Sequence, residues 1–168
     1  MKDFFSEESC TEQAVDYEIF GLIDIQDSKK PSFTSTKDEF EWAATVHNKN
    51  RKLIQYTGID YNEYFKDLFK SDKKCDGMLC YKDEPHKAVI FVELKSGLNT
   101  TKWIYKAKQQ LLSTVEKFRM CHEISDFGER KVYAANSSDS NTPTVRQNDI
   151  EDFFELGFDF YVKPTIEM

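Results

Sequence analysis

The sequence predicts an α/β protein in which a central mixed β-sheet is flanked by helices. Residues 88–95 form an apolar run of strand length, and residues 102–119 carry apolar side chains at the spacing of a helix. From residue 76 onward the expected order is strand, strand, helix, strand, helix, strand. At 168 residues, 39% apolar and 32% charged, the chain has the size and composition of one globular domain, residues 1–168.

The first part of the chain gives shorter signals. Residues 1–12 are polar, and we expect them to be loose. Residues 17–25 have the composition of a strand and end at a polar cluster that contains proline. The segment Thr-Lys-Asp-Glu has capping-box spacing and predicts a short helix from Lys37, followed by a hairpin that turns at residues 48–50. Residues 60–70 predict a short amphipathic helix or a structured loop.

Two apolar segments in the middle of the chain predict a hairpin. The first begins at Asp76, and after a charged turn the second, residues 88–95, has the pattern of a buried strand. Residues 96–101 then interrupt the pattern before the helix at 102–119. The apolar stripe of this helix consists of Ile104, Ala107, Leu111, Val115 and Phe118.

The last third of the chain completes the sheet. Residues 131–135 predict a strand, and a polar loop follows at 136–144. Residues 149–156 predict a helix that Gly157 ends, because glycine readily adopts the left-handed conformation found after helices. Residues 158–162 alternate as a final strand before a proline.

Three charged side chains fall at the ends of the predicted hairpin. Glu93 and Lys95 lie two residues apart on one strand, so they share a face and are separated by about 7 Å along it. Pairing of the hairpin would carry Asp76 back beside Glu93. Two carboxylates there could bind Mg²⁺ or Mn²⁺, with the backbone carbonyl of Leu94 as a further ligand. The lysine could activate water or offset transition-state charge, whereas the alternative is a structural ion-pair cluster.

These residues together resemble the PD-(D/E)XK, or restriction-endonuclease-like, nuclease superfamily. The resemblance covers residues 75–118: Asp76, then Glu-Leu-Lys at the end of an apolar strand, then a helix containing Gln110. It implies a metal-dependent nuclease that hydrolyses DNA or RNA. By this resemblance Asp76 and Glu93 would bind the metal, and Lys95 would activate water or stabilise charge.

Two further features of the superfamily bear on the helix and on the first half of the chain. Many members carry Gln-x-x-x-Tyr on this helix, which implies a catalytic role for Gln110; here Thr114 stands at the tyrosine position, so only the glutamine matches. Members often contribute another acid from an early element. The candidates for that acid are Glu39, Glu41 and Asp60.

Charge is distributed unevenly along the chain. The net charge of −7 argues against a broad electrostatic grip on nucleic acid. Residues 95–119, however, hold six bases and one acid, a local balance of +5 that leaves −12 for the rest. We expect Lys102, Lys106 and Lys108 in this basic strip to contact a phosphate backbone; the alternative is a solvated helix face.

The remaining expectations concern compartment and partners. The chain has no apolar run near eighteen residues and no signal-peptide pattern at its start, so we expect a cytoplasmic protein without membrane contact. Its four cysteines lack the spacing of a zinc site and are expected to be reduced. Nucleic acid is the expected ligand, and cleavage of two strands would favour a homodimer.

The acidic composition also suggests a protein partner. The resemblance implies a component of a defence or restriction system. The alternative function is a non-catalytic interaction protein, of the immunity or inhibitor type, built on a nuclease-like fold, because an acidic surface suits a basic partner better than it suits DNA.

Overall fold

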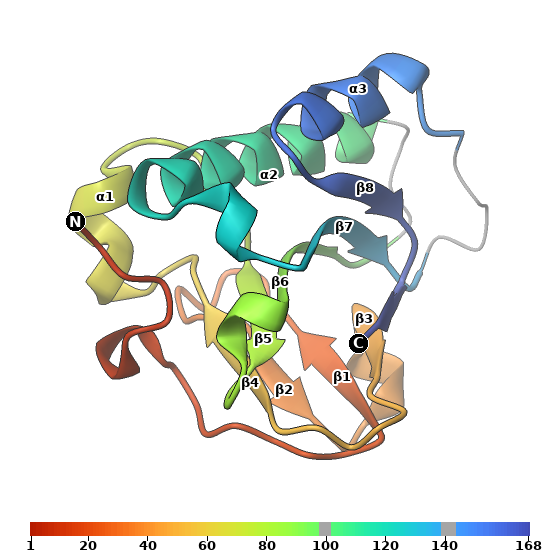
Figure 1. Ribbon diagram of the computed structural model, residues 1–168. Helices are drawn as coiled ribbons and strands as arrows, with labels where there is room; N and C mark the ends of the chain where they lie inside the picture. The colour runs from red at the N-terminus through yellow and green to blue at the C-terminus, as the bar shows by residue number, and fades with distance from the viewer. Residues whose placement is uncertain (98–101, 139–143) are drawn as a thin grey trace.

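The computed structural model describes residues 1–97, 102–138 and 144–168 and shows an α/β protein with two mixed sheets (Figure 1). Residues 98–101 of the expected break and residues 139–143 of the expected loop lie outside these ranges. The strands are β1 (Ile19–Ile23), β2 (Phe33–Ser35), β3 (Ala44–His47), β4 (Ile54–Gly58), β5 (Gly77–Tyr81), β6 (Ala88–Lys95), β7 (Glu129–Asn136), β8 (Asp159–Val162) and β9 (Thr165–Glu167). The α-helices are α1 (Lys66–Phe69), α2 (Lys102–Cys121) and α3 (Gln147–Glu155).

The larger sheet has the strand order β4-β5-β6-β7-β8. Strands β4, β5 and β6 are antiparallel neighbours, whereas β7 and β8 run parallel to β6. The predicted hairpin is therefore confirmed as β5 and β6, with Gly77 opposite Val92. Helix α2 lies in the connection from β6 to β7, and α3 lies in the connection from β7 to β8. Parallel neighbours need such a crossover, which is usually helical.

Both faces of the larger sheet are covered. Helices α2 and α3 lie over one face, and the smaller sheet, with the order β2-β1-β3-β9, packs on the other (Figure 1). Successive residues of β6 alternate between the two cores: Phe91 packs toward α2, and Val92 packs toward the smaller sheet. A strand covered on both sides shows a continuous apolar run rather than alternation, which explains the sequence of β6.

Most of the expected elements are confirmed. The strand expected at 17–25 is β1, and the segment 60–70 forms a 3₁₀ turn followed by α1. Strands β7 and β8 and helices α2 and α3 all form where periodicity places them. Gly157 ends the last of these helices with φ of +84°. Strand β9, which follows Pro164, is an additional element that the sequence did not indicate.

The expected helix at Lys37 and the hairpin after it are wrong. A single 3₁₀ turn, Glu39–Glu41, replaces the helix, because Asp38 takes a left-handed conformation and the chain is already extended at Trp42. Strands β3 and β4 do not pair: β3 lies between β1 and β9 in the smaller sheet, whereas β4 is the edge strand of the larger sheet. The two strands bury their side chains in the same core from opposite sides, β3 from the smaller sheet and β4 from the larger one.

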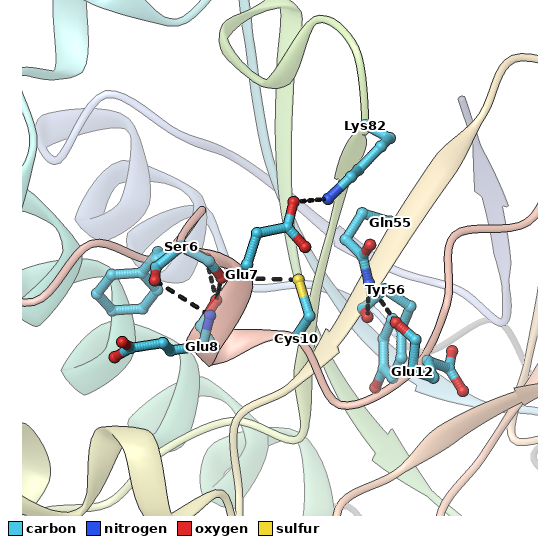
Figure 2. A network of polar contacts seen from close by, with 10 residues as sticks. Ser6, Glu7, Glu8, Cys10, Glu12, Gln55, Tyr56 and Lys82 are labelled. Atoms are coloured by element: carbon cyan, nitrogen blue, oxygen red, sulfur yellow. Dashed lines mark hydrogen bonds and ion pairs between the residues drawn. The ribbon is translucent and has the colours of Figure 1, made fainter.

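The first twelve residues are not loose. The ring of Phe4 is fully buried among aromatic residues of α2 and β6. Figure 2 shows how the following segment is held: the carboxylate of Glu7 pairs with Lys82, and the amide of Gln55 donates a hydrogen bond of 2.9 Å to the Glu12 carbonyl. The polar composition of this segment concealed its apolar anchors, Phe4 and Phe5, which pack on the core.

Candidate active site

Asp76, Glu93 and Lys95 meet at the carboxyl end of β6, on the face of the sheet that α2 covers. Side chains alternate along a strand, so Glu93 and Lys95 share the face of Phe91, and Asp76 shares the face of Met78, a neighbour in the same core. The Lys95 Nζ lies 2.5 Å from Glu93 Oε1. The Leu94 N–H donates a hydrogen bond of 2.6 Å to Asp76 Oδ2, which brings Asp76 to the end of β6.

The backbone at Asp76 is fixed by residues on the opposite face of the larger sheet, in the core that it shares with the smaller sheet. A β-carbon on Gly77 would lie 2.1 Å from the Tyr56 hydroxyl, so only glycine allows this close approach. The Tyr56 hydroxyl lies 2.6 Å from Ser32 Oγ, and Ser32 Oγ donates to the Asp76 carbonyl at 3.0 Å. Asp76 is therefore positioned by backbone and side-chain contacts rather than by a flexible turn.

Helix α2 is tied to the segment that leads into Asp76. The Gln110 Nε2 donates to the Lys74 carbonyl at 3.1 Å, and Gln110 Oε1 lies 3.5 Å from Lys95 Nζ. Thr114 Oγ1 accepts a hydrogen bond of 2.8 Å from the Cys75 N–H and donates one of 2.9 Å to the Gln110 carbonyl. The residue at the expected tyrosine position thus has a structural role that its spacing did not reveal.

Thr114→Val should destabilise the protein by about 1–3 kcal/mol, because it leaves the buried Cys75 N–H without an acceptor. Thr114→Ser keeps the hydroxyl and should lose less than half of that amount. Urea unfolding of the two variants beside the original protein measures the difference. Equal stability of the valine and serine variants would show that the hydrogen bond contributes little.

The Glu93 carboxylate is the least satisfied polar group at this site. Its residue is 0% exposed, and within the described residues neither of its oxygens has a partner with hydrogen-bond geometry. Lys95 contacts Oε1 as an ion pair, and Oε2 has no hydrogen-bond partner among the described residues. Buried charges are costly unless they are paired and fully hydrogen-bonded. The arrangement therefore has unused capacity to bind a cation.

Burial and the repulsion between carboxylates shift the pKa values of the residues at the site. Burial raises the pKa of Glu93 well above its usual range, and the negative charge of Asp76 adds to the shift. Burial likewise raises the pKa of Asp76 to about 7, with Asp24 contributing, although the Leu94 N–H opposes the shift. For Lys95 burial lowers the pKa, but the ion pair with Glu93 outweighs it, so the net shift is upward and the ammonium form is favoured.

Two acids from the first half of the chain surround this site. Asp24 follows β1, whose end lies beside the end of β6, as the 3.1 Å hydrogen bond from Gln26 to Ser96 shows. Asp24 and Asp60 both raise the pKa of Asp76 through their charge. Of the three expected early acids, Asp60 is thus the one near the site, whereas the other two, Glu39 and Glu41, lie exposed in a 3₁₀ turn.

Sequence reasoning missed Asp24. The signal that could have found it is its position, since it immediately follows a buried strand, and Glu93 likewise lies near the end of one. Nothing local, however, indicated that β1 of the smaller sheet ends beside β6 of the larger one.

The oxygens at this site fit a hard divalent cation. Asp76 and Glu93 supply carboxylates, and the Leu94 carbonyl points to the same side of β6 as its N–H, which faces Asp76. Mg²⁺ in proteins is often held by one or two carboxylates and several waters. Across the ranges that the structure describes, no group of three or more His, Cys, Asp or Glu side chains is placed to hold a metal, so a cation here would depend on this small set of ligands.

In the metal-free protein, stability should fall as the pH rises from about 4 to about 7. A raised pKa means that folded Asp76 keeps a proton that the unfolded chain releases over this range, so folding is favoured at the acid end. Asp76→Asn should remove up to about 1.4 kcal/mol of this decline per pH unit. Denaturant unfolding in EDTA from about pH 4 to about pH 7, the range between the unfolded and folded pKa values of Asp76, tests this expectation. Parallel pH profiles for the two proteins would contradict it.

The expected basic strip is only partly free. The expectation that Lys108 contacts a phosphate backbone is not supported. Its Nζ pairs with Asp149 at 2.7 Å and with Asp152 at 2.5 Å, so this side chain connects α2 to α3. Lys102 and Lys106 are exposed. Lys106 and Gln110 line an open cavity of about 380 Å³ next to the site. The other lining residues are Asp60, Asp72, Lys73 and Lys74.

Comparison of this chain with family models, with curated proteins and with solved structures found no match. In the described ranges, no helix combines the length and apolar character needed to cross a bilayer.

Proposed function

We propose that this protein is a metal-dependent nuclease with a restriction-endonuclease-like core, which hydrolyses phosphodiester bonds in DNA or RNA. One observation carries the proposal: the fully buried Glu93 carboxylate lacks hydrogen-bond partners among the described residues while facing Asp76 and Lys95. A cluster that served only stability would be expected to satisfy both oxygens. A buried carboxylate with a raised pKa and unmet hydrogen bonds is typical of a site that a ligand completes.

Each side chain has a distinct role in this proposal. Asp76, Glu93 and the Leu94 carbonyl would hold Mg²⁺ or Mn²⁺, which would supply Lewis-acid polarisation of a phosphate oxygen. The Lys95 ammonium, kept charged by Glu93, would stabilise negative charge as it builds on the phosphoryl oxygens. Gln110 would act as a positioning residue, because it contacts Lys95 and the backbone of Lys74.

The arrangement of elements supports the same proposal. The charged residues lie where β5 begins and β6 ends, and the next helix, α2, places Gln110 over them. Parallel strands β7 and β8 extend the sheet on the far side of β6. This is the order of strands and helices that the sequence pattern predicts from residue 76 onward.

The proposal is tested by incubating the purified protein with single- and double-stranded DNA and RNA. Mg²⁺ or Mn²⁺ should support cleavage of at least one of these substrates, and EDTA should stop it, because the two carboxylates cannot orient a reactive phosphate without a cation. Fragments are followed on denaturing gels. Absence of cleavage with either metal on all four substrates would refute the proposal.

The second candidate is a non-catalytic interaction protein, which the net charge of −7 favours. On this account the acidic surface would bind a basic protein, and the protein would need no metal. Calorimetric titration with Mn²⁺ distinguishes the two candidates. A nuclease should bind Mn²⁺ in a way that depends on Asp76 and Glu93, whereas an interaction protein need not bind it.

A further inference from the structure

We propose that the nucleic acid bound at this site is single-stranded and lies along the lysine-lined cavity beside α2. This inference rests on the proposed function, because it names the form of substrate that the same site would accept. The cavity and the candidate active site are continuous: Gln110 lines the cavity and contacts Lys95, and Asp60 lines the cavity and acts electrostatically on Asp76.

The cavity carries unpaired positive charge. Its two acids are already neutralised, since Asp60 pairs with Lys74 at 3.2 Å and Asp72 pairs with Lys117 at 2.8 Å. Within the described residues, no carboxylate lies at ion-pair distance from Lys73 or Lys106. These two ammonium groups are therefore available to a ligand, and a phosphate is the anion that the proposed reaction would bring there.

Helix α2 extends this charge away from the active site in one row. Lys102, Lys106 and Gln110 are spaced four residues apart, so they lie above one another on the same side of the helix. The row begins at the exposed start of α2 and ends at the contact with Lys95. A backbone that followed it would pass two lysines before it reached the candidate reactive centre.

Exposed aromatic residues accompany the lysines. Tyr105 is 65% exposed and precedes Lys106, and Tyr61 is 52% exposed and follows Asp60. Large aromatic side chains are usually buried, and each of these two exposed rings is the sequence neighbour of a cavity-lining residue. Lysines interleaved with exposed aromatic rings are the pattern with which proteins bind single strands, because unpaired bases stack on the rings.

Size and charge favour a single strand over a duplex. A cavity of about 380 Å³ has the volume of a site for one small ligand, such as one nucleotide, and a double helix could not enter it. A duplex would also bring the phosphates of its second strand against the rest of the chain, which carries −12 outside residues 95–119. A single strand that follows the lysine row would bring only one set of phosphates to the protein.

The test measures binding by fluorescence anisotropy in EDTA, which stops metal-dependent cleavage. The probes are labelled DNA and RNA oligonucleotides of one sequence, each as a single strand and as a duplex. We expect single strands to bind about tenfold or more tightly than duplexes. Lys73→Ala with Lys106→Ala should flatten the salt dependence by about 0.7 per lysine, and Tyr105→Ala should weaken binding roughly 5- to 100-fold.

Two matched variants serve as controls. Lys87→Ala removes a lysine at the opposite end of β6, and Phe154→Ala removes an exposed aromatic ring on α3; both should bind like the original protein. Equal or tighter binding of duplexes, or unchanged binding by the cavity variants, would overturn the inference even if the protein cleaves duplexes. Cavity-dependent binding of single strands without cleavage under any metal would support this inference and refute the nuclease proposal.

Discussion

Lys95→Ala should lower the rate of metal-dependent cleavage by roughly 10²- to 10⁴-fold while the protein remains folded. The Lys95 ammonium is the positive side chain that the site holds beside Glu93, and it lies at the surface end of β6 rather than in the apolar core. Its removal would leave charge on the reacting phosphate without a fixed cationic partner from the protein. Initial rates of oligonucleotide cleavage at saturating Mg²⁺ measure the loss.

The neighbouring strand provides an internal control. Glu129 and Lys131 on β7 repeat the Glu-x-Lys spacing and form an ion pair of 2.6 Å, but Glu129 is exposed and the pair lies at the start of its strand. Lys131→Ala should therefore leave cleavage within about twofold of the original rate, as surface ion pairs contribute little. Equal losses for Lys95→Ala and Lys131→Ala would show that Lys95 has no special role.

At about pH 8, well above the usual glutamate pKa of about 4.3, Glu93→Gln should raise the free energy of unfolding of the metal-free protein by about 1–3 kcal/mol. The same substitution should abolish cleavage. The buried carboxylate lacks hydrogen-bond partners among the described residues, so neutralising it removes a desolvation cost, whereas Lys95 remains partly exposed to water. Sites that bind a charged ligand commonly sacrifice stability in this way. Denaturant unfolding in EDTA measures the change.

The same pair of proteins should respond differently to metal. Mn²⁺ at about 100 times its dissociation constant should stabilise the original protein by about 2.7 kcal/mol and leave Glu93→Gln unchanged. If Glu93 and Lys95 instead form only a structural ion pair, the substitution should destabilise the protein by about 3–5 kcal/mol. The sign of the change in EDTA thus separates a ligand site from a structural cluster.

The sequence predicted those parts of the molecule in which local pattern and burial coincide. Strand β6 is covered on both faces, and its continuous apolar run revealed it. Helix α2 faces the core with residues such as Leu111 and Val115 at helical spacing. Because only residues 82–87 connect β5 to β6, the pairing that brings Asp76 to Glu93 could be predicted from the sequence.

What the sequence could not predict depends on contacts between distant segments. The sequence predicted that residues before the turn at 48–50 would pair with those after it, whereas β3 pairs with β1 and β9. Strand β9, its parallel neighbour, comes from the far end of the chain. Asp24 reaches the site only because the two sheets pack together. Lys108 looked free until α3 placed Asp149 beside it.

Titration of the metal-free protein with Mn²⁺ in a calorimeter tests the central claim most directly. The site should bind Mn²⁺ in the original protein and in Glu129→Gln, and both Asp76→Asn and Glu93→Gln should lose that binding, since each removes a ligand oxygen that carries charge. Binding that persists unchanged in both variants, or that is absent from the original protein, would contradict the account.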